Sequence, residues 1–321
     1  MNRALFTKLR ADAEKSPVFH AVIVILLGVG FASLPLYRLF PGTFGGEGNS
    51  LLFWGGLLRL IIAGTGIVLA FGYGFGKQFK GSAGVTAYLL LIPALLAMVN
   101  NFPFIGFFGG GAEFTADATG IALFVFYCFS VAAFEEVFFR GIAFPLIFKS
   151  LENTRRPVFY SVAASSALFA AAHLVNVFSG SSIGAVAMQT GYSFLIGALC
   201  AISLITVKNV YVPIAFHFIY DVGGLWLDGE IGVASALQWD TVTVIITAVL
   251  GVIVAVYMLI LLLKTKKERV YCTFGILPRL IEKDDKGGEN IQPGEDPGKT
   301  ESDNAAQRGE DKGEGTDLRY K

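Results

Sequence analysis

The stretch "TGIALFVFYCFSVAAFEEVFFRGIAFPLI", Thr119 to Ile147, decides the fold class of this chain. It is long enough to cross a membrane, because about 20 apolar residues in a helix span a hydrocarbon core of about 30 Å. Yet it carries Glu135, Glu136 and Arg140 in its second half. Ionisable side chains inside a span are costly and usually functional. The stretch therefore predicts a membrane helix that contains part of a polar site.

The composition of the whole chain agrees with a membrane location. Of the 321 residues, 54% are apolar and only 16% are charged, which is far from the average of soluble proteins. The formal net charge of zero hides a split, because residues 1–281 hold 18 of the 25 basic and 13 of the 25 acidic residues. We expect a polytopic membrane protein with the lipid bilayer around it and no nucleic-acid partner.

Eight apolar segments are candidates for membrane spans. They run over residues 18–37, 51–72, 85–107, 119–147, 157–178, 184–207, 209–227 and 241–263. None shows the period-2 alternation of strands, and unsatisfied backbone groups are costly in lipid. The sequence therefore predicts an all-α fold, a polytopic membrane helix bundle with about eight transmembrane helices.

Charges between the segments predict the orientation. If the N-terminus is cytoplasmic, the segments on that side hold the Lys and Arg residues of 1–17, 77–80, 149–156, 208 and 264–269. The opposite loops hold only Arg38. Because cytoplasmic loops are enriched in Lys and Arg, we expect a multi-pass integral membrane protein with both termini cytoplasmic. Its glycine-rich chain and compact loops favour a bacterial cell membrane.

Four parts follow from these boundaries. Residues 1–17 form a cytoplasmic N-terminal segment, residues 18–263 an eight-span domain, and residues 264–281 a basic juxtamembrane segment suited to an anionic leaflet. Residues 282–321 hold 12 of the 25 acidic residues and few apolar ones, so they predict a disordered acidic tail.

Spacing connects several polar residues within the spans. Residues four apart share a helix face, which pairs Glu136 with Arg140 and His217 with Asp221. Glu135 points about 100° away from Glu136 and is left without that partner. In low dielectric it must take up a proton or find another partner, and His173 and His217 lie on other predicted spans.

These residues suit the hydrolysis of a carbonyl compound. Glu135 is placed to act as a general base that takes a proton from water, with His173 hydrogen-bonded to the same water. His217 can then donate to the oxyanion that forms. The alternative is a satisfied polar network that joins the fourth, fifth and seventh spans, and spacing alone does not separate the two.

Three motifs resemble a known family. "EEVFFR" (Glu135, Glu136, Arg140), "FAAAH" (Phe169, His173) and "HFIYD" (His217, Asp221) are similar to the EExxxR, FxxxH and HxxxN/D motifs of the CAAX protease and bacteriocin-processing family. This family of intramembrane endopeptidases includes the type II CAAX prenyl endopeptidase. The resemblance covers about 90 residues.

The resemblance implies an eight-span helical bundle whose site opens to the cytoplasm. It implies that Glu135 is the catalytic base with His173 beside the water, and that His217 and Asp221 stabilise the oxyanion. Glu136, Arg140 and Phe169 would support them. Many relatives carry Asn where this chain has Asp221, and an ionised carboxylate would repel an oxyanion. Asp221 is therefore expected either to be protonated or to orient His217.

The sequence favours no cofactor but leaves a divalent metal such as zinc open. Family descriptions have included the term metalloprotease, and Glu135, His173 and His217 could supply three zinc ligands. The HExxH pattern of zincins does not occur in the chain. We expect catalysis by a glutamate-activated water without a metal.

Other functions compete with the protease. "GYSF", Gly191 to Phe194, would allow a serine protease in which Ser193 pairs with a histidine. A proton-coupled transporter, or a bacteriocin-immunity or partner-binding protein, would use the same buried groups without catalysis. The substrate, a peptide or a membrane protein, is encoded in no motif. The oligomeric state and the role of Arg59 in the second span are likewise left open.

Overall fold

The computed structural model describes residues 3–102, 104, 107–178, 182–226, 231–236 and 241–277. They belong to one compact unit, Met1–Pro278, and a second unit comprises Arg279–Lys321. The predicted acidic tail, residues 282–321, lies outside the described residues.

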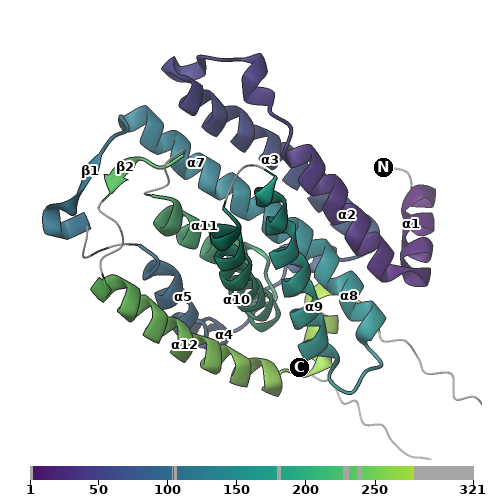
Figure 1. The fold of residues 1–321 in the computed structure, drawn as a ribbon. Coiled ribbons are helices and arrows are strands. Elements are labelled where there is room, and N and C mark those ends of the chain that lie inside the picture. The colour runs from purple at the N-terminus through teal and green to yellow at the C-terminus, as the bar shows by residue number, and fades with distance from the viewer. Residues whose placement is uncertain are drawn as a thin grey trace, which may run out of the picture. The chain divides into compact units, whose positions relative to one another are not determined.

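The described part of the chain is built from helices (Figure 1). The helices are α1 Arg3–Lys15, α2 Pro17–Ala32, α3 Glu47–Tyr73, α4 Val85–Leu89, α5 Ile92–Val99, α7 Ala118–Glu135, α8 Phe144–Leu151, α9 Pro157–Ala172, α10 Ile183–Val207, α11 Tyr211–Leu225, α12 Thr241–Lys264 and α13 Lys267–Phe274. Shorter helical turns are η1 Leu36–Leu39, η2 Thr43–Gly45, η3 Gly76–Phe79, η4 Phe107–Gly111, η5 Glu136–Ala143 and η6 His173–Val177.

The helical content confirms the predicted all-α membrane bundle. Among the described residues, six helices are long and apolar enough to cross a membrane: Pro17–Leu39, Glu47–Tyr73, Ala118–Leu151, Pro157–Val177, Ile183–Val207 and Val244–Lys264. They coincide with six of the eight predicted segments. The predicted segment 85–107 contains a shorter apolar helix, Val85–Val99, and the segment 209–227 contains the 15-residue α11.

One small β-ribbon accompanies the helices. Strand β1, Ala112–Phe114, pairs antiparallel with strand β2, Ala234–Ala236, and Glu113 lies opposite Ser235. The ribbon connects the residues just before α7 with those that follow α11. The ribbon therefore holds the chain before α7, the helix of Glu135, beside the chain after α11, the helix of His217.

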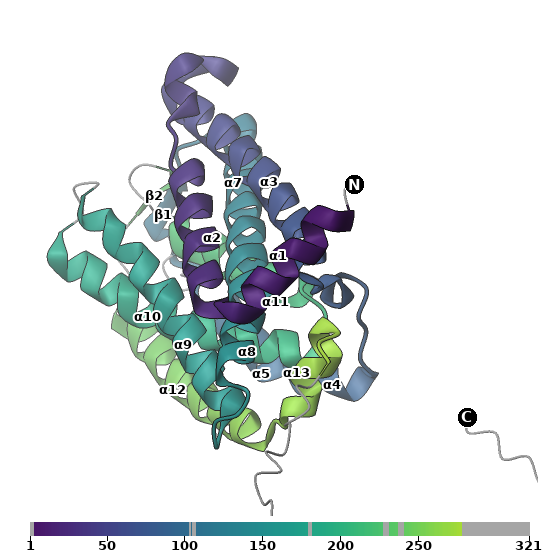
Figure 2. The ribbon, with the colours of Figure 1, turned by 90° about the vertical axis from the view of Figure 1, so that its right-hand side faces the viewer.

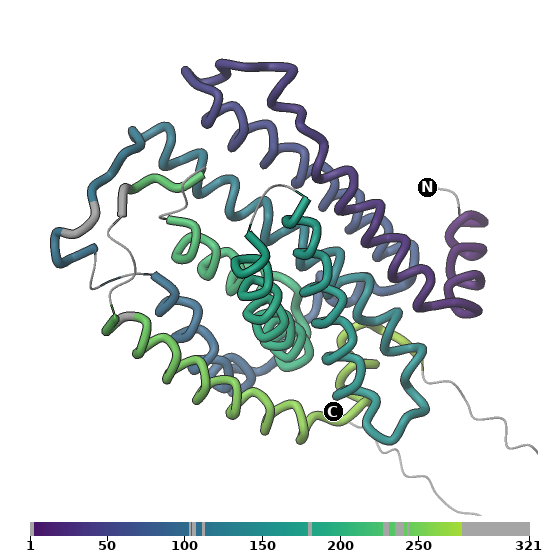
Figure 3. The backbone as a smooth tube through the Cα atoms, viewed as in Figure 1, coloured from purple at the N-terminus to yellow at the C-terminus, as the bar shows by residue number. Residues whose placement is uncertain are grey.

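The centre of the bundle is the continuous helix formed by α7, η5 and α8. It begins at Asp117, whose carboxylate accepts from the backbone N–H of Gly120 at 2.8 Å as an N-cap. Every residue of η5 is buried. In Figures 1 and 3, α3 runs along α7, while α10 is seen nearly end-on between α9 and α12.

The segment η5 has the wider turns of a π-helix, and Pro145 follows it closely in the sequence. Pro145 has no N–H to donate to the carbonyl four residues before it, which is that of Gly141. That carbonyl instead accepts from Nε2 of Gln78 at 2.8 Å. The N–H of Phe144 donates to the carbonyl of Phe139, five residues back. Wide turns of this kind occur often at functional sites.

The segments α1, α13 and the C-terminal end of α8, which carry basic residues, lie at one end of the bundle (Figure 2). Arg10 of α1 donates to the carbonyl of Gly72 at the C-terminal end of α3, at 2.8 Å. Arg269 of α13 donates to the carbonyl of Thr206 at the end of α10, at 2.9 Å. Lys149 of α8 lies 3.4 Å from Glu14. The segments that we expect to be cytoplasmic are thus neighbours in space.

Candidate active site

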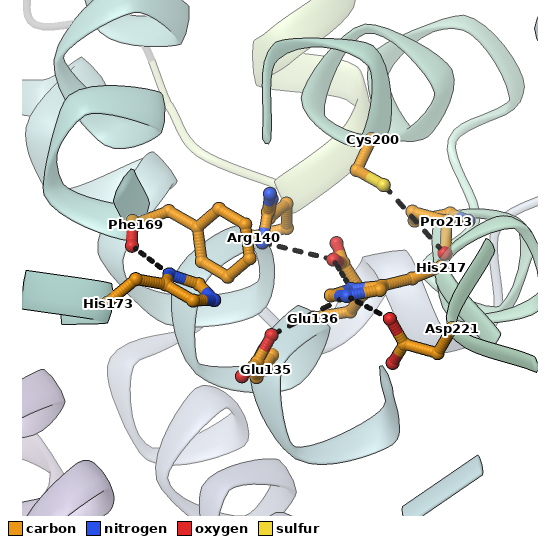
Figure 4. A network of polar contacts seen from close by, with 9 residues as sticks. All are labelled: Glu135, Glu136, Arg140, Phe169, His173, Cys200, Pro213, His217 and Asp221. Atoms are coloured by element: carbon orange, nitrogen blue, oxygen red, sulfur yellow. Dashed lines mark hydrogen bonds and ion pairs between the residues drawn. The ribbon is translucent and has the colours of Figure 1, made fainter. Parts of the chain in front are cut away.

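His217 of α11 contacts three carboxylates (Figure 4). Its Nδ1 donates to Oε1 of Glu136 at 2.7 Å. Its Nε2 lies 3.5 Å from Oε2 of Glu135 and 3.5 Å from Oδ1 of Asp221. The last two distances exceed those of good N–H···O hydrogen bonds, so Glu136 is the group that fixes the ring. The sequence did not predict the contact between Glu136 and His217, which lie 81 residues apart.

Glu136 also forms the predicted ion pair with Arg140. Nη1 of Arg140 lies 3.0 Å from the same Oε1 that His217 contacts. The two side chains are 0% and 2% exposed, which places the whole ion pair away from solvent. The i, i+4 spacing predicted this pair, and the structure contains it. One carboxylate oxygen thus holds both a guanidinium and an imidazole in place.

Glu135 differs from Glu136 in its access to solvent. The Glu135 side chain is 18% exposed whereas that of Glu136 is 0% exposed. Glu135 lines a cavity of about 910 Å³, together with His173, His217 and Asp221. Only Glu135 of the two glutamates can therefore meet a water molecule or a substrate in that cavity.

Phe169 and His173 form the second wall of the site, at the end of α9. The Phe169 ring lies 4.9 Å from the ring of His173 and 5.9 Å from that of His217, edge-on in both cases. The Arg140 guanidinium carbon lies 4.2 Å from its centroid. Phe169 therefore packs against Arg140, His173 and His217, and its supporting role stays a prediction.

The tautomer of His173 follows from its backbone contact. Its Nδ1 lies 3.0 Å from the carbonyl oxygen of Phe169. A carbonyl can only accept, so Nδ1 carries the hydrogen. The neutral ring then has an unprotonated Nε2, which lies on the side of Glu135 and His217 in Figure 4. This nitrogen can accept a hydrogen bond from a water molecule in the cavity.

Asp221 is close to the site but weakly held within it. Its Oδ1 lies 3.5 Å from Nε2 of His217, and its Oδ2 is buried with no hydrogen-bond partner among the described residues. Glu136 contacts the other ring nitrogen of His217, and the two expected roles of Asp221 stay predictions. Asp221 therefore faces the nitrogen of His217 that is turned toward Glu135.

The structure brings together Glu135, Glu136, Arg140, Phe169, His217 and Asp221, with His173 against Phe169. Among the described residues, no group of three or more His, Cys, Asp or Glu side chains is arranged to hold a metal ion. The notion that Glu135, His173 and His217 bind zinc stays a prediction.

Ser193 of α10 lines the same cavity. A serine nucleophile requires a base within hydrogen-bond reach. In the part of the chain that the structure describes, no hydrogen bond joins Ser193 to either histidine of the site. The contact that the serine interpretation needs is not formed.

Two supporting residues carried no signal in the sequence. Gln78 reaches the π-helical segment from η3, as described above, and is fully buried. Gly197 of α10 lies against the site, because a Cβ there would come 3.1 Å from Nη2 of Arg140 and 3.2 Å from the Phe169 ring. A glutamine between helices and one glycine among 38 are recognised only when their neighbours are known.

Residues 117–223 match the family of type II CAAX prenyl endopeptidases, Rce1-like. The match confirms the resemblance predicted from the three motifs, and it covers all seven predicted site residues. The Rce1-like family is a family of CAAX-type membrane proteases, and the long apolar helices of this chain agree with an integral, multi-pass protein. The comparisons with curated proteins and with solved structures gave no match.

Proposed function

We propose that this protein is an intramembrane endopeptidase that hydrolyses a peptide bond with a water activated by Glu135. The observation that carries the proposal is the contrast between the two adjacent glutamates. Glu136 is sealed against Arg140 and His217, whereas Glu135 reaches the cavity. A base must meet the water whose proton it takes, so the catalytic role falls to Glu135.

His173 supports the same water in this proposal. Its Nδ1–H is held by the Phe169 carbonyl, which leaves Nε2 as an acceptor. A water bonded to both Glu135 and His173 is oriented for attack on the substrate carbonyl. Positioning of this kind lowers the barrier because the entropy of alignment is lost on folding and not in the reaction.

His217 is the proposed donor to the oxyanion. Because Glu136 accepts from Nδ1, only Nε2 can face the reacting carbonyl, and it must carry a hydrogen to donate. After attack, the proton taken by Glu135 goes to the leaving amine as the C–N bond breaks. Asp221 lies beside Nε2 at 3.5 Å, which is too long for a good hydrogen bond.

We favour this mechanism without a metal and keep zinc as its alternative. Imidazole and carboxylate are ligands that zinc accepts, so Glu135, His173 and His217 would be its ligands. Activity in the purified protein that persists after dialysis against a chelator supports the metal-free mechanism. Activity that is lost on dialysis and restored by zinc contradicts it.

Orientation and substrate belong to the same proposal. We infer that the end of the bundle that carries α1, α13 and Lys149 faces the cytoplasm, since it gathers the basic segments. The substrate is a peptide or a membrane protein that reaches the cavity from within or beside the bilayer.

The decisive experiment compares new protein N-termini in cells that express the wild type, Glu135→Gln or Glu47→Gln at equal membrane levels. Glu47 is an exposed glutamate in the first turn of α3, outside the cavity, and serves as the control. Termini shared by the wild type and the control, and absent with Glu135→Gln, support the proposal and identify the substrates. Cleavage that survives Glu135→Gln contradicts the general-base role.

A further inference from the structure

Arg59 of α3 lines the cavity that contains Glu135. Among the described residues that line this cavity, it is the only arginine or lysine. It lies within a helix long and apolar enough to cross a membrane. A cation in such a helix is costly unless it has a partner or a function. The mechanism proposed above does not use Arg59.

The contacts of Arg59 hold its side chain but do not neutralise it. Nη1 donates to the carbonyl of Gly55 at 3.0 Å, and the guanidinium carbon lies 4.9 Å from the centroid of the Tyr127 ring. No ion pair to Arg59 is found in the described part of the chain. Arg140 provides the contrast, because its charge is matched by Glu136.

The backbone leaves room for this arrangement. A Cβ at Gly55 would come 3.2 Å from Nη1 of Arg59 and 3.2 Å from the ring of Tyr127. A side chain there would press on both groups. Gly55 therefore allows the guanidinium to lie against its own helix and over the aromatic face, with its remaining N–H groups available to a ligand.

The spacing of residues along α7 gives the approximate distance from Arg59, which lies against Tyr127, to Glu135. Tyr127, Val131 and Glu135 all line the cavity from this helix. Tyr127 and Glu135 are eight residues apart, which at 1.5 Å per residue is about 12 Å along the axis. An extended peptide covers that distance with about three or four residues at 3.3 to 3.6 Å each.

We propose that Arg59 is an anion-binding subsite of the cavity, which selects peptide substrates by a carboxylate about three or four residues from the cleaved bond. The inference rests on the proposed peptidase function. A guanidinium offers paired N–H donors that match a carboxylate. The carboxylate belongs to an acidic side chain or to the end of the peptide, and the experiment distinguishes the two.

The first experiment measures binding, so it does not depend on turnover. Full-length Glu135→Gln protein in phosphatidylcholine vesicles is titrated with pools of random-sequence peptides that carry Glu or Gln at one fixed position. We expect Glu pools to bind about tenfold or more tightly at the preferred positions, the effect of one hydrogen bond to a charged group. A second change, Arg59→Gln, should remove the preference, and Arg59→Lys should retain part of it.

Peptides with a free or an amidated C-terminus distinguish the two sources of the carboxylate. A preference for the free C-terminus that requires Arg59 assigns the subsite to the chain end. Gly55→Ala leaves the charge in place but displaces Nη1, so it should weaken the preference without abolishing it. Equal binding of Glu and Gln pools and of free and amidated peptides, or a preference that survives Arg59→Gln, overturns the proposal.

Vesicles that contain phosphatidylglycerol test a lipid as the anion. If the effect of Arg59→Gln follows the lipid and not the charge of the peptide, Arg59 binds a headgroup and the proposal is wrong. In protein that retains Glu135, the single change Arg59→Gln should raise KM for acidic peptides and leave kcat unchanged. This pattern indicates that substrate binding is lost equally in the ground state and the transition state. If binding depends on peptide charge and on Arg59 but the wild type cleaves no peptide, the result contradicts the proposed peptidase function and supports the anion-binding subsite.

Discussion

Nδ1 of His217 donates to Oε1 of Glu136 across 2.7 Å, and the same oxygen lies 3.0 Å from Nη1 of Arg140. One buried carboxylate thus ties α11 to the central helix and fixes the rotation of a histidine ring. Its neighbour Glu135 is left facing the cavity. The adjacent glutamates have different surroundings because they project from the helix about 100° apart.

Glu136→Gln should lower both stability and activity. It leaves the Arg140 charge buried without a counter-ion, and loss of one partner of a buried ion pair costs about 3–5 kcal/mol. It also weakens the acceptor for His217. The melting temperature in detergent measures the first effect. Glu14→Gln, which breaks the exposed contact with Lys149, should change the melting temperature little. An unchanged melting temperature in Glu136→Gln would contradict the ion pair.

Asp221→Asn should retain peptide cleavage. Asp221 is 3.5 Å from His217, and Glu136 already orients the ring. An amide at this position can donate to an oxyanion, which an ionised carboxylate cannot. Steady-state kinetics on any substrate found for the wild type provide the measurement. A loss as deep as that caused by Glu135→Gln would show that the carboxylate itself is required.

Gly197→Ala should disturb the site through packing alone. The added Cβ would press on Arg140 and Phe169, and overpacking of this kind costs about 1–3 kcal/mol. Gly191→Ala lies in the same helix with no atom within 4 Å of its added Cβ, and it should be neutral or slightly stabilising. Thermal unfolding of the two variants checks the difference. Equal melting temperatures would contradict the close packing at Gly197.

Gln78→Met should lower kcat as well as stability. It removes the donor to the Gly141 carbonyl, and a buried acceptor left unpaired costs about 1–3 kcal/mol. The π-helical segment that carries Glu136 and Arg140 would then relax. Asn209→Ala is the matched control, since Asn209 donates to the carbonyl of Gly81 and not to that of Gly141. It should lose stability while kcat stays unchanged; a similar fall in kcat in both variants would make Gln78 a purely structural residue.

Much of the fold was predictable because lipid imposes simple requirements. Long apolar runs must be helical when no water can satisfy the backbone, and six of them are long helices in the structure. The pairing of Glu136 with Arg140 was predictable for a similar reason, since it depends only on the helical repeat. The shortness of α11 and the break between α4 and α5 were not, because hydropathy reports length poorly where helices pack against protein.

By itself, the sequence determined the helical membrane class, the three polar motifs and the contacts that fall within one helix. Only the tertiary structure decided that His217 bonds to Glu136, that Gln78 meets the wide turn before Pro145, and that Arg59 lines the cavity of Glu135. The physical reason is that helices in lipid associate through close packing and interhelical polar contacts, with little hydrophobic driving force between them. Such contacts depend on the shapes of helices far apart in the chain, which no local pattern encodes.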